Sequence, residues 1–338
     1  MNPPSLGNVG VRIAGSGMCV PDRVLSNADL ESMMDTSDEW IVQRTGIRER
    51  RIADRENKGE TARTLATEAL RRAVANAKLD PTDLDAIIVA TVTPDMACPP
   101  TASRVAADIG ATGCPGWDLN AACTSFVFAL NSANALVRSG LASTVGVIGT
   151  DMLSRHMRYD TKGRATAILF GDAAGALVVK ATDDTTRGVL AQSMHSDGSR
   201  WDELYIPRHA DEITSGEQDP ELIDTLLMNG RSVFKFAVST FGDLIQETLD
   251  QAGVTADQVD HFVCHQSNAR ILASARDRFG IPEDKLLVNI DRYGNTVSAS
   301  VPVVFQELVD AGKVKEGQLA MFLAFGGGLT WGSSLWRL

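Results

Sequence analysis

The chain has 338 residues, of which 44% are hydrophobic and 22% charged, with 29 glycines and a formal net charge of −11. This composition excludes a disordered or fibrous protein and is typical of an α/β protein with one large unit or two domains. The negative charge argues against a protein whose main role is nucleic-acid binding, because that role needs Lys and Arg against phosphates.

Targeting signals and metal-binding patterns are not found in the sequence. Residues 1–4 lack the basic and apolar regions of a signal peptide, and no apolar run reaches the roughly 18 residues that span a bilayer. The five cysteines are an odd number without CxxC spacing, which indicates neither a disulfide framework nor a metal site. We therefore expect a cytoplasmic protein that contacts no membrane and holds no metal.

Strand-like and helix-like runs alternate along the chain. The expected elements, in order, are a helix start with a capping box at 26–29, a helix at 60–78, a strand at 85–92, a helix at 123–138, a strand at 144–150, a strand at 259–264 and a helix at 299–309. Such alternation predicts layered α/β structure.

A weak internal repeat relates residues 170–177 to residues 325–335. Both segments begin with Phe-Gly and continue through small residues into a terminal strand. The repeat predicts two related α/β halves, residues 1–185 and 186–338, joined through the polar stretch 181–187.

Cys123 is the first candidate nucleophile. A short strand is expected to run directly into the helix at 123–138, which would place Cys123 in the first helical turn. Free backbone N–H groups and the helix dipole there would lower the thiol pKa from about 8.5 and could hold an oxyanion. A lone cysteine is more often a small core residue, so the surrounding residues must decide.

His265 and Asn295 supply polar groups at two further transitions. His265 follows the strand at 259–264, and Asn295 precedes the helix at 299–309. Side chains at such positions face clefts in α/β proteins, and we expect both to meet Cys123. Taken singly, His265 also fits a capping or core histidine, and Asn295 fits a helix cap or a turn.

Five motifs occur in order along the chain: TSDEWIVQRTGI at 36–47, AAC at 121–123, HQSN at 265–268, GNT at 294–296 and FGGGLTWG at 325–332. Together they resemble β-ketoacyl-acyl-carrier-protein synthase III, the initiating condensing enzyme of bacterial fatty-acid synthesis. The resemblance spans nearly the whole chain. It implies a thiolase-like five-layered αβαβα fold and a homodimer.

The resemblance also implies catalytic roles for Cys123, His265 and Asn295. An acyl-CoA substrate would acylate Cys123, and a malonyl carrier protein would then lose carbon dioxide. His265, as a neutral ring, and Asn295 would donate hydrogen bonds to the resulting enolate, while the backbone N–H groups of Cys123 and Gly327 would hold the second oxyanion. No permanently bound cofactor is expected.

Substrate contacts are implied in the same way. Trp40 and Arg164 would stack on the adenine of CoA and Arg44 would meet a phosphate, although the three also fit a structural tryptophan and solvated arginines. The other implied contacts are Ser267 and Asn268 along the pantetheine arm, Phe234 and Phe325 in the substrate channel, and Lys235, Arg270, Arg276 and Arg278 toward an acidic acyl carrier protein. Asp277 interrupts this basic face at a position where the family often has another base.

Cys98 marks a departure from short-chain members of the family. They often place an aromatic residue at this position, before Pro99-Pro100, on the floor of the partner subunit's acyl pocket. A thiol there predicts primers longer or bulkier than acetyl, unless another side chain refills the space.

The sequence discriminates between relatives of this fold. No cysteine follows Cys264, which argues against a thiolase, and no histidine follows His265, which argues against a chain-elongating enzyme with two histidines. Two alternatives stay open. One is an acyltransferase or long-chain condensing enzyme of specialised metabolism, and the other is a catalytically silent binding subunit.

Overall fold

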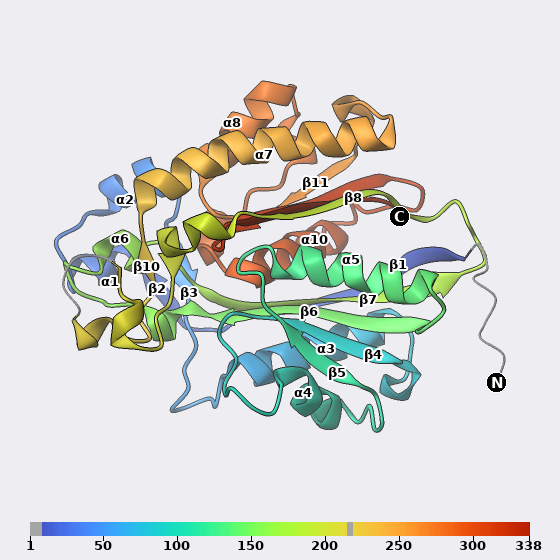
Figure 1. Ribbon diagram of the computed structural model, residues 1–338, viewed down its shortest axis with the longest axis horizontal. Helices are drawn as coiled ribbons and strands as arrows, with labels where there is room; N and C mark the ends of the chain where they lie inside the picture. The colour runs from blue at the N-terminus through green and yellow to red at the C-terminus, as the bar shows by residue number, and fades with distance from the viewer. Residues whose placement is uncertain (1–8, 215–218) are drawn as a thin grey trace.

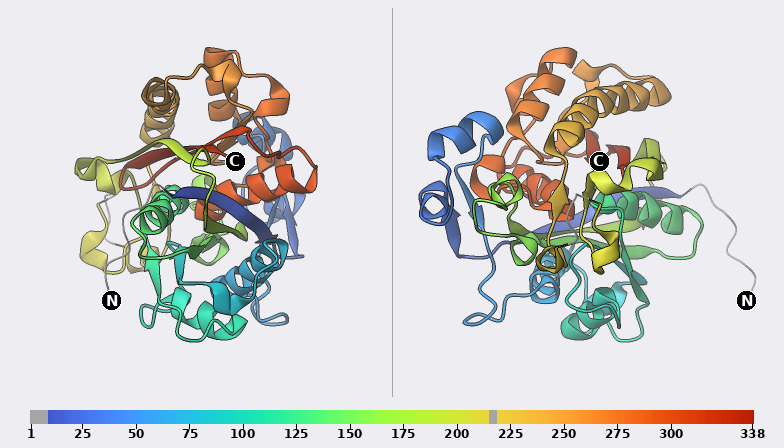
Figure 2. Two further views of the ribbon diagram at one scale, coloured as in Figure 1. Left: turned by 90° about the vertical axis from the view of Figure 1, so that its right-hand side faces the viewer. Right: turned by 60° about the vertical axis from the view of Figure 1, so that its left-hand side comes forward.

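The computed structural model describes residues 9–214 and 219–338. The prediction that the chain lacks a signal peptide concerns residues 1–4, which lie outside the described residues. Two β-sheets and three helical layers alternate in the order α, β, α, β, α (Figure 1). The same order is seen after a quarter turn, with α7 and α8 on one outer side and α3 and α4 on the other (Figure 2). The layered α/β architecture predicted from the sequence is confirmed.

The first sheet has five strands. Their order across the sheet is β1 (Gly10–Cys19), β7 (Asp172–Thr182), β6 (Thr144–Met152), β4 (Ala86–Ala90) and β5 (Gly116–Leu119). β6, β4 and β5 run parallel, whereas β7 runs antiparallel to both β1 and β6. The outer face is covered by α3 (Ala62–Asn76) and α4 (Thr101–Ile109).

The second sheet has four strands, in the order β11 (His261–Cys264), β12 (Leu319–Gly326), β13 (Thr330–Arg337) and β8 (Gly188–Ser196). Its outer face packs against α7 (Gly230–Ala252) and α8 (Ala269–Phe279). Gly326 lies opposite Thr330 in the β12–β13 pair, so residues 327–329 form the turn between them.

Two helices, α5 (Ser125–Arg138) and α10 (Ser300–Asp310), fill the layer between the sheets. The two sheets share a strand order. In the first sheet β1 lies beside β7, followed by β6 and β4, and in the second sheet β8 lies beside β13, followed by β12 and β11. The link from β7 to β8 is residues 183–187. Because helices of both halves share the central layer, a division into domains at 185 and 186 stays a prediction.

Shorter elements surround one end of the layers. They are β2 (Val24–Ser26), β3 (Glu49–Arg51), β9 (Leu204–Tyr205), β10 (Leu227–Met228), α1 (Asn27–Glu31), α2 (Asp38–Thr45), α6 (Arg164–Ala167) and α9 (Ile290–Tyr293). The predicted capping box opens α1, where Ser26 Oγ accepts the Asp29 N–H at 3.1 Å and Asp29 accepts the Ser26 N–H at 2.8 Å.

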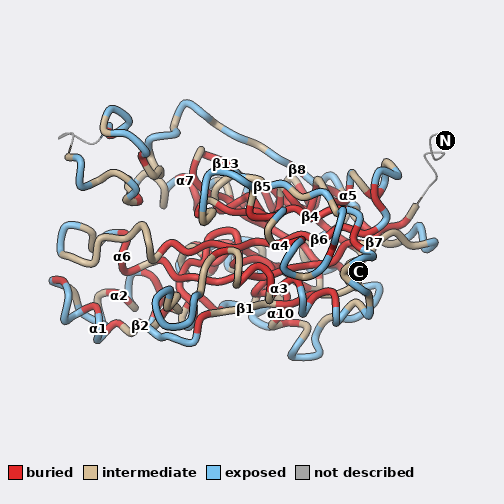
Figure 3. The backbone as a smooth tube through the Cα atoms, turned by 90° about the horizontal axis from the view of Figure 1, so that it is seen from below, coloured by how far each residue is buried: buried red, intermediate tan, exposed pale blue. Residues whose placement is uncertain are grey.

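The sheets are buried on both faces, which explains why their strands read as continuous apolar runs. Every residue of β6 and of β12 is buried, and Figure 3 shows the burial colour along the central strands. Gly149 in β6 permits a close crossing, since a Cβ there would lie 2.4 Å from the carbonyl oxygen of Ser298. No helix in the described ranges has both the length and the apolar character needed to cross a bilayer.

Candidate active site

Cys123 lies in a tight turn between β5 and α5. Ala122, before it, has a left-handed φ of +52°, and the helix begins only at Ser125, with Thr124 as its cap. The Ser125 hydroxyl accepts the Ala121 N–H at 2.7 Å and donates to the Ala122 carbonyl at 2.6 Å, which stabilises the turn. The prediction that Cys123 occupies the first helical turn was therefore wrong by two residues.

The Cys123 thiol is buried, with 5% of the residue exposed. Burial raises its pKa to about 12; the charge of Asp151 adds to this, while the backbone N–H groups of Gly327 and Cys123 lower it. The prediction of a lowered pKa was wrong, because a buried site withholds the solvation that the anion needs. The two N–H groups at the sulfur nevertheless form the pair expected to hold an oxyanion.

Gly326 brings the end of β12 against the nucleophile. A Cβ on Gly326 would lie 2.7 Å from the Cys123 nitrogen and 3.1 Å from its sulfur. Real Cβ atoms essentially never come within 3.0 Å of other heavy atoms, so only glycine permits this approach.

His265 directly follows β11, and its backbone N–H donates to the Leu323 carbonyl at 2.8 Å. Its side chain is fully buried, with the Phe325 ring edge-on at 5.6 Å. Burial lowers the pKa of His265 to about 3, against a smaller raising effect of the Val297 carbonyl. The ring is therefore neutral near pH 7, with a single N–H that can donate a hydrogen bond.

Asn295 lies in the connection between α9 and the short 3-10 helix Val297–Ala299, rather than opening the long helix itself. Its backbone N–H donates to the Leu169 carbonyl at 2.8 Å, and its carbonyl accepts the Gly171 N–H at 3.0 Å. These bonds fasten a loop of the second half to the segment before β7.

Two cavities meet at Cys123. The wider one, about 500 Å³, lies on the side of Ala122, Gly327, Leu153 and Leu226. The narrower one, about 90 Å³, is lined by the predicted residues His265, Asn295, Ser267, Asn268, Phe234 and Phe325. Phe170 and Leu204 border both. The sulfur thus stands where two differently shaped spaces join.

The proposed CoA contacts lie in and beside the narrow cavity. The guanidinium carbons of Arg44 and Arg164 lie 4.6 Å and 4.9 Å from the centre of the Trp40 ring. An adenine between two planar groups needs roughly 7 Å, twice a van der Waals contact, so Arg164 or Trp40 must move before a base can enter. The Ser267 hydroxyl is buried with no hydrogen-bond partner within the described ranges, and Asn268 Nδ2 donates to the Arg44 carbonyl at 3.0 Å.

The predicted carrier-protein residues lie on α7 and α8. Lys235 and Arg270 are exposed, and the Arg270 guanidinium lies 5.1 Å over the ring of Phe234 at the narrow cavity. Arg276 pairs with Glu283 at 2.6 Å and Arg278 with Asp243 at 3.1 Å, which reduces the positive charge these two offer.

Cys98 is exposed and lines neither of these two cavities. Three further residues near the site are not predicted from the sequence. Asp151 is buried and accepts five hydrogen bonds, Ser300 contacts the ring of His265, and Trp201 lines the wide cavity. No local motif distinguishes these residues, since each reaches the site only through the packing of distant segments.

A repeated α/β architecture that brings a turn cysteine together with a histidine and an asparagine from the other half defines a thiolase-fold condensing enzyme. Residues 117–198 match the family described as 3-oxoacyl-[acyl-carrier-protein (ACP)] synthase III, and residues 249–338 match the family of its C-terminal part. The chain belongs to the β-ketoacyl-[acyl-carrier-protein] synthase III family, and is an acyltransferase.

Individual relatives agree with this assignment. A β-ketoacyl-[acyl-carrier-protein] synthase III of Erythrobacter litoralis is 43% identical over 327 residues, covering 96% of this chain and 98% of the relative. The crystal structure of 3-oxoacyl-[acyl-carrier-protein] synthase III from Aquifex aeolicus has a TM-score of 0.89 at 41% identity, covering 97% of this chain and all of that one. The priming β-ketosynthase of the R1128 polyketide pathway has a TM-score of 0.89 at 34% identity, covering 97% and 96%. The predicted thiolase-like fold and family are confirmed.

Proposed function

We propose that this enzyme transfers an acyl group from acyl-CoA to Cys123 and condenses it with malonyl-acyl carrier protein, initiating fatty-acid synthesis. The observation that carries the proposal is the position of Cys123. Its sulfur faces the backbone N–H groups of Gly327 and Cys123 and lies between a wide cavity and a narrow one that contains His265 and Asn295.

In the first half-reaction the Cys123 sulfur attacks the thioester carbonyl of acyl-CoA. The carbonyl oxygen becomes an oxyanion and accepts hydrogen bonds from the backbone N–H groups of Gly327 and Cys123. Both groups are held in place before the reaction begins. The carbon–sulfur bond to CoA then breaks, the thiol proton passes to the departing CoA thiolate, and the acyl chain remains on Cys123. We assign the acyl chain to the wide cavity and the pantetheine arm to the narrow one, because only the narrow cavity holds the polar side chains of Ser267 and Asn268.

In the second half-reaction the malonyl thioester loses carbon dioxide. The electron pair of the breaking bond forms an enolate whose oxygen accepts hydrogen bonds from His265 and Asn295. The enolate carbon attacks the acyl thioester on Cys123, and the resulting oxyanion again accepts hydrogen bonds from the two N–H groups. Collapse breaks the bond to sulfur and releases the β-ketoacyl carrier protein and the Cys123 thiolate, which takes up a proton from water to restore the thiol. Each reacting group comes from the chain or its substrates, so we propose no permanently bound cofactor.

The wide cavity supports a primer longer than acetyl. Its lining near the sulfur is mainly apolar, with Val92, Leu153, Phe170 and Leu226 among its side chains. An apolar chain gains about 0.8 kcal/mol per buried methylene in such a space. We therefore propose that Cys98 of the partner subunit, being smaller than an aromatic residue, leaves room in the acyl pocket for additional carbons of the primer.

We also propose a cytoplasmic homodimer. Within the described part of the chain, β5 is an edge strand of the first sheet, and Trp117 on it is 37% exposed. An open strand edge with an exposed aromatic side chain favours pairing with a second copy about a two-fold axis. The neighbouring loop, with exposed Met96 and Cys98, would then lie against the partner.

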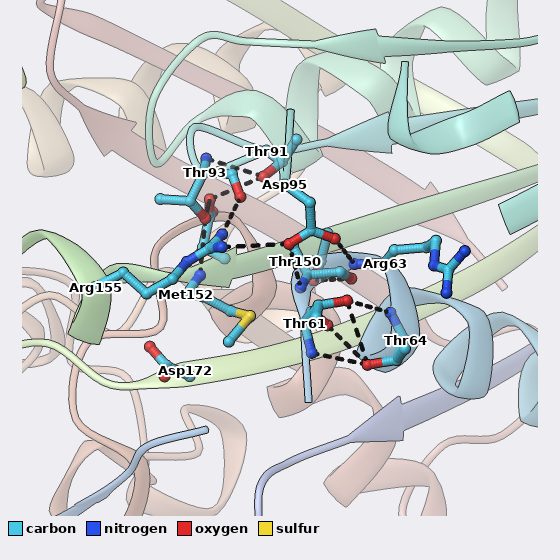
Figure 4. A network of polar contacts seen from close by, with 12 residues as sticks. Thr61, Arg63, Thr64, Thr91, Thr93, Asp95, Thr150, Met152, Arg155 and Asp172 are labelled. Carbon is cyan, nitrogen blue, oxygen red and sulfur yellow. Dashed lines mark hydrogen bonds and ion pairs between the residues drawn. The ribbon is translucent and has the colours of Figure 1, made fainter. Parts of the chain in front are cut away.

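The base of this loop is held firmly. Asp95 accepts the Arg63 N–H at 3.0 Å at the start of α3 and pairs with Arg155 at 3.3 Å, as Figure 4 shows. Arg155 also donates to the Thr93 carbonyl at 2.9 Å. These contacts fix the position of the loop's base, and they therefore limit the directions in which its exposed tip can point.

For the acidic carrier protein we propose the face of α7 and α8 beside the narrow cavity. Lys235 and Arg270 are its strongest candidates, because within the described residues neither has an acidic partner within 4.0 Å. Arg270 also stacks on Phe234, which lines the cavity through which the pantetheine arm would pass. The same face serves CoA and the carrier protein in turn.

The proposal is tested by exposing the protein to a panel of acyl-CoAs and then to malonyl-acyl carrier protein, with intact-protein mass spectrometry after each step. The acyl mass should appear on the chain first and disappear when the malonyl carrier protein is added, with release of carbon dioxide. The acyl-CoA that reacts fastest names the primer. An acyl adduct that never turns over with malonyl carrier protein would instead favour an acyltransferase with another acceptor.

A further inference from the structure

Ser300 is the residue that contacts the far side of the His265 ring. Its Oγ lies 2.7 Å from His265 Nδ1 at the start of α10. Both residues are fully enclosed, with His265 at 0% and Ser300 at 2% exposed. His265 Nε2 has no hydrogen-bond partner within the described ranges, although the residue lines the narrow cavity.

The position of a single proton decides what His265 can do. A neutral imidazole carries one N–H, and the bond made by one ring nitrogen fixes whether the other is a donor or an acceptor. If Nδ1 carries the proton, Nε2 presents a lone pair to the cavity and repels an enolate oxygen. If Nε2 carries it, His265 donates to that oxygen.

The Ser300 hydroxyl also has one proton and two possible acceptors. Its Oγ lies 2.7 Å from His265 Nδ1 and 2.9 Å from the Val297 carbonyl oxygen. That carbonyl already accepts the backbone N–H of Ser300. His265 Nδ1, by contrast, has no other hydrogen-bond donor within the described residues.

From this geometry we propose that Ser300 is a positioning residue that donates its hydroxyl proton to Nδ1 and so holds His265 with its proton on Nε2. The proposal rests on the decarboxylation role of His265 proposed above. Ser300 touches no substrate; it acts through the ring.

Removal of the hydroxyl has a specific chemical consequence. In Ser300→Ala the hydroxyl donor to Nδ1 is gone, and the Val297 carbonyl, which lies 2.9 Å from that hydroxyl in the parent, is left as the acceptor on this side of the ring, which favours the proton on Nδ1. The enolate then loses a donor and meets a lone pair. We expect malonyl decarboxylation to fall on the order of 10²-fold, the effect of losing one oxyanion donor, while acylation of Cys123 stays within a few-fold of the parent.

The direct test is nuclear magnetic resonance of the full-length protein labelled with ¹⁵N-histidine. Two-bond ¹H–¹⁵N correlations distinguish protonated from bare ring nitrogens, and the His265 signals are those missing in His265→Gln. The parent and Ser300→Thr should show the proton on Nε2, and Ser300→Ala should show it on Nδ1. A parent with the proton on Nδ1, or a tautomer unchanged in Ser300→Ala, would overturn the proposal.

Kinetics of the two half-reactions distinguish a failure of the role proposed for Ser300 from a failure of the proposed condensing function. Ser132→Ala is the matched control, because its hydroxyl donates only to the Phe128 carbonyl on α5, at 2.8 Å. Both of its half-reactions should match those of the parent. If His265→Ala left decarboxylation intact, the proposed function would fail. If His265→Ala were inactive but Ser300→Ala were not, only the role of Ser300 would fail. The tautomer of the parent is read without any substitution at Ser300, so the test survives a Ser300 variant that does not fold.

Discussion

The side-chain oxygen of Asn295 accepts the backbone N–H of Val297 at 2.9 Å. This bond identifies the oxygen, because only an acceptor can face an N–H group. The amide NH₂ of Asn295 is thereby left as the group that can donate into the narrow cavity, which Asn295 and His265 both line. Asn295 can therefore place a side-chain donor beside His265 in that cavity.

Loss of either donor should slow malonyl decarboxylation much more than acylation of Cys123. In His265→Ala and Asn295→Ala we expect malonyl decarboxylation to fall on the order of 10²- to 10³-fold each, because each removes one hydrogen bond to the enolate. Acylation of Cys123 uses backbone donors and should change little. Stopped assays of carbon dioxide release and of acyl-enzyme formation measure the two steps; equal losses in both would contradict the assignment.

The buried ring of His265 should make the protein sensitive to acid. Its folded pKa of about 3 lies below the unfolded value of about 6.5, so the stability gained by the neutral ring is present above pH 6.5 and is lost as the pH falls toward 3. Between pH 6.5 and 5 this amounts to about 2 kcal/mol. Urea unfolding at both pH values should show this loss in the parent and a smaller loss in His265→Gln. An identical pH dependence would indicate that the ring titrates normally.

Asp151 holds three segments together beneath the site. One oxygen accepts the Val92 N–H at 2.8 Å and the other accepts the Ser298 N–H at 3.0 Å, with further bonds from the hydroxyls of Thr91, Thr93 and Ser298. In Asp151→Asn the NH₂ group must face one of the two backbone donors. We expect a loss of about 1–3 kcal/mol in the free energy of unfolding, measured with urea.

Asp80→Asn is the control for Asp151→Asn, since Asp80 caps an exposed turn through the Thr82 N–H at 3.0 Å and asparagine caps equally well. It should leave the free energy of unfolding close to that of the parent. If Asp151→Asn were as mild as this control, the carboxylate would not be needed to hold the three segments.

The size of the side chain at position 98 should set the range of primers. We expect the parent to use hexanoyl- and dodecanoyl-CoA at least as well as acetyl-CoA, and Cys98→Phe to lose the longer substrates selectively. The variant should fold normally, because Cys98 is exposed in the protomer. The measurement is kcat/KM for the three substrates. A parent that strongly prefers acetyl-CoA, with no narrowing in Cys98→Phe, would remove Cys98 from the acyl pocket.

The sequence predicted those features that depend on neighbouring residues. The amphipathic pattern at 60–78 gave α3, observed at Ala62–Asn76, because one face of that helix packs on the sheet. The apolar run at 85–92 gave β4, observed at Ala86–Ala90, because every residue of that strand is buried. Motif resemblance supplied Cys123, His265 and Asn295, which the fold brings to adjoining cavities.

Properties that depend on distant segments could not be predicted. The left-handed Ala122, which places Cys123 before the helix rather than in it, is unusual for a residue with a Cβ. The raised pKa of Cys123 arises from burial and from Asp151, 28 positions away in the sequence, and neither leaves a local signal. The contact of Ser300 with His265 likewise exists only after α10 enters the central layer.

Cys123 is proposed to carry the acyl group during condensation. Intact-protein mass spectrometry after incubation with an acyl-CoA tests it most directly, with Cys123→Ala compared with Cys264→Ala, since Cys264 is equally enclosed but lines neither cavity. We predict one acyl group on the parent and on Cys264→Ala and none on Cys123→Ala. An undiminished acyl mass on Cys123→Ala would show that another residue carries the acyl group.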